Sequence, residues 1–127
     1  MSNRTFLTLH GIIYAAFAIV LFMLPETVWP LYGVKINDQY AFFLSQHTSI
    51  FLGGLAAVSF LLRDIEYIPT QIQLLKALLI TNLLGVLITG YAGIMGIFTG
   101  FGWSDPAFFA TLTTLSLVQL KKQATQH

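Results

Sequence analysis

Two histidines, His10 and His47, are the ionisable side chains that lie well inside long apolar stretches of this 127-residue chain. A charged group in hydrocarbon costs about 2.5 kcal/mol or more, so each histidine is by default a candidate functional residue. A neutral imidazole can donate a hydrogen bond, ligate haem or a pigment, or act as an acid or base. The chain has no cysteine, which excludes thiol chemistry and iron–sulfur clusters.

The depth expected for each histidine argues against a shared ligand site. His10 lies shortly after Arg4, whereas His47 lies shortly after Tyr40 on a helix expected to run in the opposite direction. At 1.5 Å per residue, the two rings differ in depth by roughly 10 Å within a core of about 30 Å. Paired haem ligands need similar depths, and a phenylalanine stands four residues before each histidine, where pigment sites often have a small residue. We therefore expect no cofactor and no metal, and hydrogen bonds across helices are favoured over haem or pigment ligation.

The same arithmetic sorts the other polar residues into two groups. Asn82 is expected level with His10, which makes an inner-leaflet polar pair. A second group is expected near the outer third of the membrane: Gln46, His47, Thr89, Trp103 and Thr111. This outer group is the candidate binding site for a small ligand. The alternative at each position is a structural hydrogen bond between helices, and no catalytic residue is assigned.

The elements that must position these residues are transmembrane helices. The chain is 56% hydrophobic and 9% charged, and its mean hydropathy is +0.76, whereas an ordinary soluble domain is about 25% charged. Four apolar segments predict an all-α fold, an integral membrane four-helix bundle forming one domain over residues 1–127, with helices at about 5–24, 40–62, 72–99 and 106–121. The fourth segment is short for a span, but Asp105-Pro106 is a typical helix start.

Small residues recur every three or four positions along the third segment, KALLITNLLGVLITGYAGIMGIFTG. On a helix this spacing places them on one face. In a membrane, such a glycine face lets neighbouring helices approach closely. We therefore expect helix packing at Gly85, Gly93, Gly96 and Gly100.

The distribution of cations predicts the orientation. With four spans, one side of the membrane holds Arg4, Arg63, Lys76, Lys121 and Lys122, and the other holds Lys35. By the positive-inside rule both termini are expected to be cytoplasmic. Trp29 and Trp103 then lie on the outer side, as an interfacial aromatic belt does. The net charge of +1 indicates no nucleic-acid partner.

In length, in its four expected spans and in a proline-aromatic outer loop with the turn Leu31-Tyr32-Gly33, the chain resembles the small DoxX-like bacterial inner-membrane proteins. Many of these have no assigned activity. The resemblance implies a four-helix membrane bundle in a bacterial inner membrane and does not imply a reaction.

Three functions follow, in order of preference. The first is a non-enzymatic accessory or assembly subunit of a larger membrane complex, or a homo-oligomer, whose partners are the bilayer and other subunits or itself. This function comes first because the chain lacks membrane-embedded carboxylates and has a glycine face suited to helix packing. The alternative is a binder or carrier of a small apolar ligand, such as a quinone, lipid or pigment, in an outer-leaflet pocket. An enzyme that uses His47 as acid or base comes third, so an enzymatic activity is not favoured.

Overall fold

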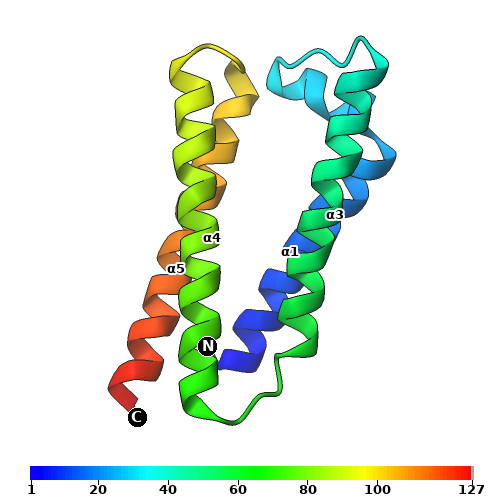
Figure 1. Cartoon of the computed structure of the whole chain (residues 1–127). Coiled ribbons are helices and arrows are strands. Elements are labelled where there is room, and N and C mark those ends of the chain that lie inside the picture. The colour runs from blue at the N-terminus through cyan, green and yellow to red at the C-terminus, as the bar shows by residue number, and fades with distance from the viewer. Residues whose placement is uncertain (127) are drawn as a thin grey trace.

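The protein is all-helical, as predicted, and its computed structural model describes residues 1–126 (Figure 1). The long helices are α1 (Asn3–Met23), α3 (Gln39–Leu61), α4 (Ile68–Ile94) and α5 (Ser104–Gln126). The short ones are α2 (Pro25–Val28), η1 (Trp29–Tyr32) and η2 (Gly100–Trp103). The helices α1, α3 and α4 are long and apolar enough to cross a membrane, which fits the predicted membrane class.

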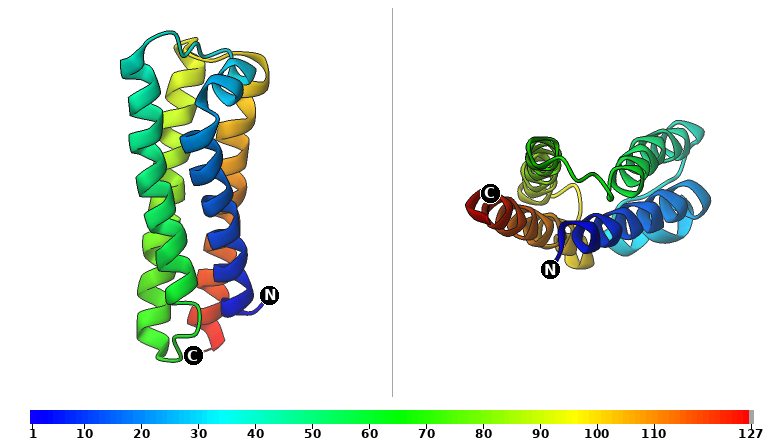
Figure 2. Two further views of the ribbon diagram at one scale, coloured as in Figure 1. Left: turned by 90° about the vertical axis from the view of Figure 1, so that its right-hand side faces the viewer. Right: turned by 90° about the horizontal axis from the view of Figure 1, so that it is seen from below.

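The long helices form two antiparallel hairpins, α1 with α3 and α4 with α5 (Figures 1 and 2). The hairpins approach each other along α1 and α5, whereas α3 and α4 lie apart (Figure 2, right). Apolar side chains cover the outward faces of the described helices, among them Ile19, Phe51 and Leu87, each more than half exposed. In a bilayer these side chains contact lipid tails, so their exposure costs nothing.

Two helix starts depend on capping side chains. The Ser2 hydroxyl accepts a hydrogen bond from the Thr5 N–H, and the Asp38 carboxylate accepts one from the Ala41 N–H at 2.8 Å. Each cap satisfies one of the free N–H groups in a first helical turn. The helix α4 has no such side-chain cap and begins at Ile68, four residues earlier than predicted. Pro69 lies in its first turn, where a missing N–H costs nothing.

The predicted end of the third helix, at residue 99, is wrong. The helix α4 ends at Ile94, and Gly96 adopts a φ of +75° in the left-handed region. The N–H groups of Gly96 and Ile97 donate to the carbonyls of Gly93 and Ala92, at 3.1 and 2.9 Å. This is a Schellman motif, which requires glycine at the left-handed position and ends the helix there. Gly96 is therefore a turn residue outside any helix, whereas Gly100 is the first residue of η2, and both have open space where a Cβ would lie.

The two ends of the molecule have different chemistry. At the charged end, where the termini meet the α3–α4 loop, Arg4 Nε lies 3.1 Å from Asp64 Oδ1 and Lys122 Nζ donates to the Met1 carbonyl. At the opposite, aromatic end, formed by α2, η1 and η2, the Thr99 N–H donates to the Tyr32 carbonyl at 3.1 Å. Both ends thus join the first hairpin to the second.

Candidate functional site

A buried polar network joins all four long helices. Its members are His10 and Tyr14 of α1, Ser59 of α3, Asn82 of α4 and Ser116 of α5. None of these side chains is more than 2% exposed. In hydrocarbon each of these polar groups needs a partner inside the protein, because no lipid tail can supply one.

Asn82 stands at the centre of this network. Its amide oxygen accepts a hydrogen bond from the Tyr14 hydroxyl at 2.5 Å, and its amino group lies 3.0 Å from Nε2 of His10 and 3.4 Å from the Ser116 hydroxyl. Because the amino group donates, Nε2 of His10 accepts and carries no proton. The ring is then neutral and protonated at Nδ1, which faces the Ser59 hydroxyl at 3.4 Å. The His10 ring also stacks on Tyr14, with centroids 4.6 Å apart.

The structure brings together the two residues of the expected inner polar pair, His10 and Asn82. The two serines of the network were not expected. The signal for Ser59 is the spacing of the buried positions of α3, Ser45, Ser49, Ala56 and Ser59, which follow one another by four, seven and three residues. A spacing near 3.5 marks the side of a helix that faces a partner helix. The serines at these positions therefore place Ser59 on the same side of α3 as Ser45 and Ser49, inside the bundle.

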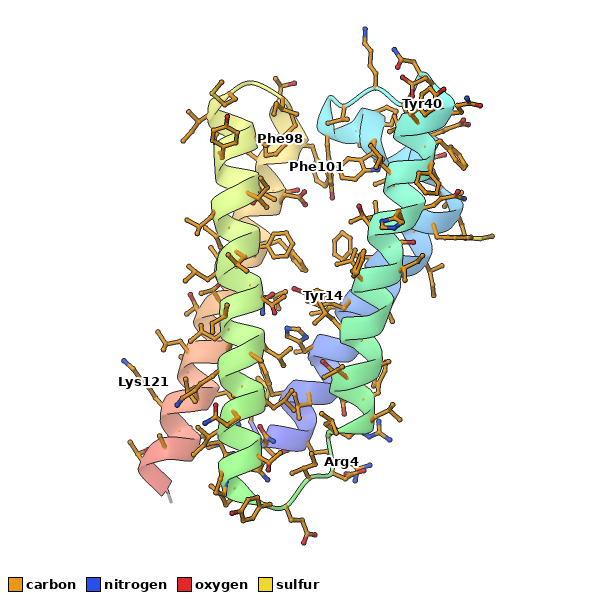
Figure 3. The ribbon with its side chains drawn as sticks, viewed as in Figure 1. Arg4, Tyr14, Tyr40, Phe98, Phe101 and Lys121 are labelled. Atoms are coloured by element: carbon orange, nitrogen blue, oxygen red, sulfur yellow. The ribbon has the colours of Figure 1, made fainter. Side chains whose placement is uncertain are left out.

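Apolar clusters hold the network in place on both sides. Toward the charged end, Phe6 and Leu7 of α1 pack against Leu75 and Leu78 of α4. Toward the aromatic end, Tyr14 packs with apolar residues of α3 and α5, among them Ala56, Leu55, Leu112 and Phe108. The Tyr14 side chain lies in the space between the two hairpins (Figure 3). The network is therefore a fixed layer across the middle of the bundle.

A cavity of about 350 Å³ lies between the hairpins, on the side of Tyr14 that faces the aromatic end. Its walls are apolar side chains of all four long helices: Phe17, Leu21, Leu52, Ile88, Phe108 and Phe109. The Phe17 and Phe108 rings contact each other in this wall, with centroids 4.9 Å apart. A volume near 300 Å³ is the lower end of the range for small-molecule sites, and such sites are mostly apolar. The cavity has the size and the lining of a site for a small apolar molecule.

Aromatic rings close the cavity at the aromatic end. Trp29 and Tyr32 line it, and their ring centroids are 5.8 Å apart. Phe101 of η2 lies 5.3 Å from Tyr32, which brings the two loops together over the cavity (Figure 3). Gly33 follows Tyr32 with a φ of +79°, and a Cβ there would meet the Thr99 hydroxyl at 2.7 Å. A glycine at this position therefore permits the close approach of the two loops.

Most polar groups of the cavity wall are already hydrogen-bonded. The hydroxyls of Thr48 and Thr89 donate to carbonyls of their own helices, at 2.9 and 2.7 Å, and the Trp29 indole N–H donates to Ser45 at 2.8 Å. The side chains of Tyr32 and Asp105, which we call the rim pair, interact with each other and not with a carbonyl of their own helix.

The rim pair lies outside the three apolar spans. The pKa of the Tyr32 hydroxyl is raised, first by burial and then by the neighbouring carboxylate. Asp105 was expected only as a helix-start residue. Its place in a cavity follows from the approach of the two hairpins, which no local pattern encodes.

Of the five residues expected to form an outer ligand site, Thr89 lines the cavity and the others do not. Gln46 donates to the Phe22 carbonyl at 3.4 Å, and the exposed Thr111 bonds to its own helix. His47 is exposed on α3, with its ring 5.6 and 5.5 Å from those of Phe43 and Phe51. Trp103 is 48% exposed.

Two of the glycines expected to pack helices contact rings of this same chain. A Cβ on Gly85 would lie 2.5 Å from the Phe109 ring of α5, and one on Gly93 would lie 2.7 Å from the Trp103 ring of η2. Both glycines therefore let the second hairpin close on itself. The glycine face of α4 is occupied at these positions by the chain's own aromatic rings.

The fold and its three apolar helices are typical of an all-helical membrane protein. We compared the chain with protein-family models, with curated proteins and with solved structures, and none of them matches.

Proposed function

We propose that this chain is a small integral membrane protein that binds a small apolar molecule in the cavity between its hairpins. The cavity itself supports the proposal: about 350 Å³ of space lined by aromatic and aliphatic side chains. Such a volume inside a 127-residue protein is a large loss of packing. An apolar ligand that fills it recovers those contacts. The function ranked second from the sequence, a binder or carrier, thereby becomes the first.

Filling the cavity tests this function. Thr89→Trp places an indole in the space, whereas Thr111→Trp places the same ring on the exposed surface of α5. We expect the neutral fluorescent probe 1-aminoanthracene to bind the wild type and the Thr111→Trp variant alike, and to bind Thr89→Trp about tenfold more weakly or not at all. Titration in nanodiscs measures this. Equal binding to all three proteins would locate the probe elsewhere and reject the cavity as its site.

We further propose that α5 is a fourth span, so that both termini are cytoplasmic in a bacterial inner membrane. Its 23 residues would extend about 35 Å. Its hydroxyl side chains fit a membrane because they are hydrogen-bonded within the helix, whereas the buried Gln119 leaves its amide nitrogen without a partner among the described residues. Ser116, Gln119 and Gln123 are buried, and the hydroxyls of Thr111, Thr113 and Thr114 each donate to a carbonyl of the preceding turn. These bonds lower the cost of placing α5 in hydrocarbon.

Single-cysteine labelling tests the orientation. Because the chain has no native cysteine, each introduced cysteine is the single thiol that can react. We expect cysteines at Ser2, Glu66 and Thr125 to react with a membrane-impermeant maleimide only from the cytoplasmic side. A cysteine at Lys35 should react only from the opposite side. Labelling of the Thr125 and Lys35 positions from the same side would contradict four spans.

A second candidate, an accessory subunit or a homo-oligomer, is favoured by the exposed His47. An imidazole on a face that also exposes Phe43 and Phe51 is poorly matched to lipid tails, and a neighbouring helix would offer it a hydrogen bond. Purification from the native membrane in mild detergent decides this. A particle with the mass of one chain plus detergent would contradict the candidate.

A further inference from the structure

Asp105 is the acidic residue that lines the cavity, whose walls are mostly apolar, and its side chain interacts with the neutral Tyr32 hydroxyl. Within residues 1–126 the ion pairs involve Asp64, and no cation lies within ion-pair distance of Asp105. Its position in the first turn of α5 has an ordinary structural use, because a carboxylate there interacts favourably with the helix dipole. That use, however, does not require a carboxylate that borders a cavity of this size.

Aromatic rings line the same cavity as this carboxylate. Trp29 and Tyr32 line the cavity with Asp105, and Phe108 follows it by one helical turn on the same cavity wall. The face of an aromatic ring attracts a cation, and the attraction grows where water is excluded. A carboxylate without a counter-charge beside such rings is complementary to a positively charged group.

The cavity is also accessible from the side. Thr48 of α3 and Ile88 of α4 both line it and both are exposed, Ile88 by 63%. Because α3 and α4 lie apart, these exposed lining residues place the entry between the two helices, on the side that would face the lipid. An amphiphile in the bilayer can enter there with its apolar part among the phenylalanines and its head near the aromatic end.

We propose that the occupant is an organic cation with an apolar body, an ammonium or similar onium compound, whose charge lies beside Asp105. This identification rests on the proposed function, because it presupposes that the cavity binds an apolar molecule. It adds the charge of the ligand, the residue that recognises this charge and the entry between α3 and α4.

Two probes that share a chain and differ in the head test the proposal: octyltrimethylammonium, a cation, and 1-octanol, which is neutral. Each displaces 1-aminoanthracene from the protein in nanodiscs of zwitterionic lipid. The variant Asp105→Asn keeps the shape of the side chain and removes its charge. We expect octyltrimethylammonium to bind this variant about tenfold more weakly than the wild type, while octanol binds both equally. Comparing proteins with the same probe cancels the partitioning of that probe into lipid.

Two matched variants complete the design. Glu26→Gln removes an exposed carboxylate at the same end of the molecule but outside the cavity, so its binding of the cation should equal that of the wild type. Asp105→Glu keeps the charge and should keep the preference for the cation, which also covers the case in which Asp105→Asn does not fold. If the cation binds Asp105→Asn as well as the wild type while octanol binds normally, the proposed ligand class is wrong and the apolar site stands. If neither probe displaces 1-aminoanthracene from the wild type, the proposed function fails as well.

Discussion

Replacing Asn82 by leucine is expected to destabilise the protein by about 2 kcal/mol, because it removes three hydrogen bonds that average about 0.6 kcal/mol each in a membrane bundle. The leucine fills the space of the amide but leaves the Tyr14 hydroxyl, Nε2 of His10 and the Ser116 hydroxyl without this partner. Since Asn82 is 0% exposed, water cannot replace it. Equilibrium unfolding by steric trapping in bicelles measures the change.

The matched control is the neighbouring residue. The Thr81 hydroxyl donates to the Ala77 carbonyl of its own helix, so Thr81→Val should change the free energy of unfolding by less than about 0.5 kcal/mol. Tyr14→Phe should cost less than Asn82→Leu, and the double variant should cost less than the two changes added, since both remove one shared bond. A leucine variant as stable as the wild type would show that the network fixes the arrangement of the helices without stabilising it.

The second large effect is expected at Gly85. An alanine Cβ there would lie 2.5 Å from Cδ1 and 2.7 Å from Cγ of Phe109, so α4 and α5 must separate or the ring must turn. Such overpacking costs about 1–3 kcal/mol. Because Phe109 lines the cavity, we also expect weaker binding of 1-aminoanthracene. Steric trapping and the probe titration measure the two consequences.

Gly90 provides the control on the same helix. No atom lies within 4 Å of the position that its Cβ would take. Gly90→Ala should therefore be neutral or should stabilise the protein by about 0.4–1 kcal/mol, because alanine is the better helix former. If Gly85→Ala and Gly90→Ala had the same effect, close packing of α4 on Phe109 would not be a constraint.

Much of the fold could be predicted from the sequence, because local physics determines it. The length of each apolar run and the caps at Ser2 and Asp38 determine where helices form. The end of α4 was misplaced for a specific reason. In the sequence, Gly96 continues the three- or four-residue spacing of the glycine face, and only its left-handed conformation distinguishes a helix stop from a packing glycine.

The candidate site could be predicted only in part. His10 and Asn82 were expected together because residue counts along two helices place both side chains at the same depth in the membrane, and the structure has them 3.0 Å apart. Depth does not determine rotation about the helix axis, which is why His47 and Thr89 were grouped although His47 is exposed on α3 and Thr89 faces the cavity. The cavity itself results from two hairpins that meet along α1 and α5 and diverge at α3 and α4, an arrangement that depends on the packing of the whole chain.

The polar face of α5 has a consequence for how the protein reaches its membrane. Ser116, Gln119 and Gln123 are buried in the folded bundle, but during synthesis they would meet lipid if α5 entered the bilayer by itself. A segment with such residues partitions poorly from the translocon. If α5 spans the membrane as we propose, it is expected to insert together with α4, as a preformed hairpin held by Phe109 on Gly85. The helix α5, about the last fifth of the chain, would then depend on α4 for insertion before it depends on α4 for folding.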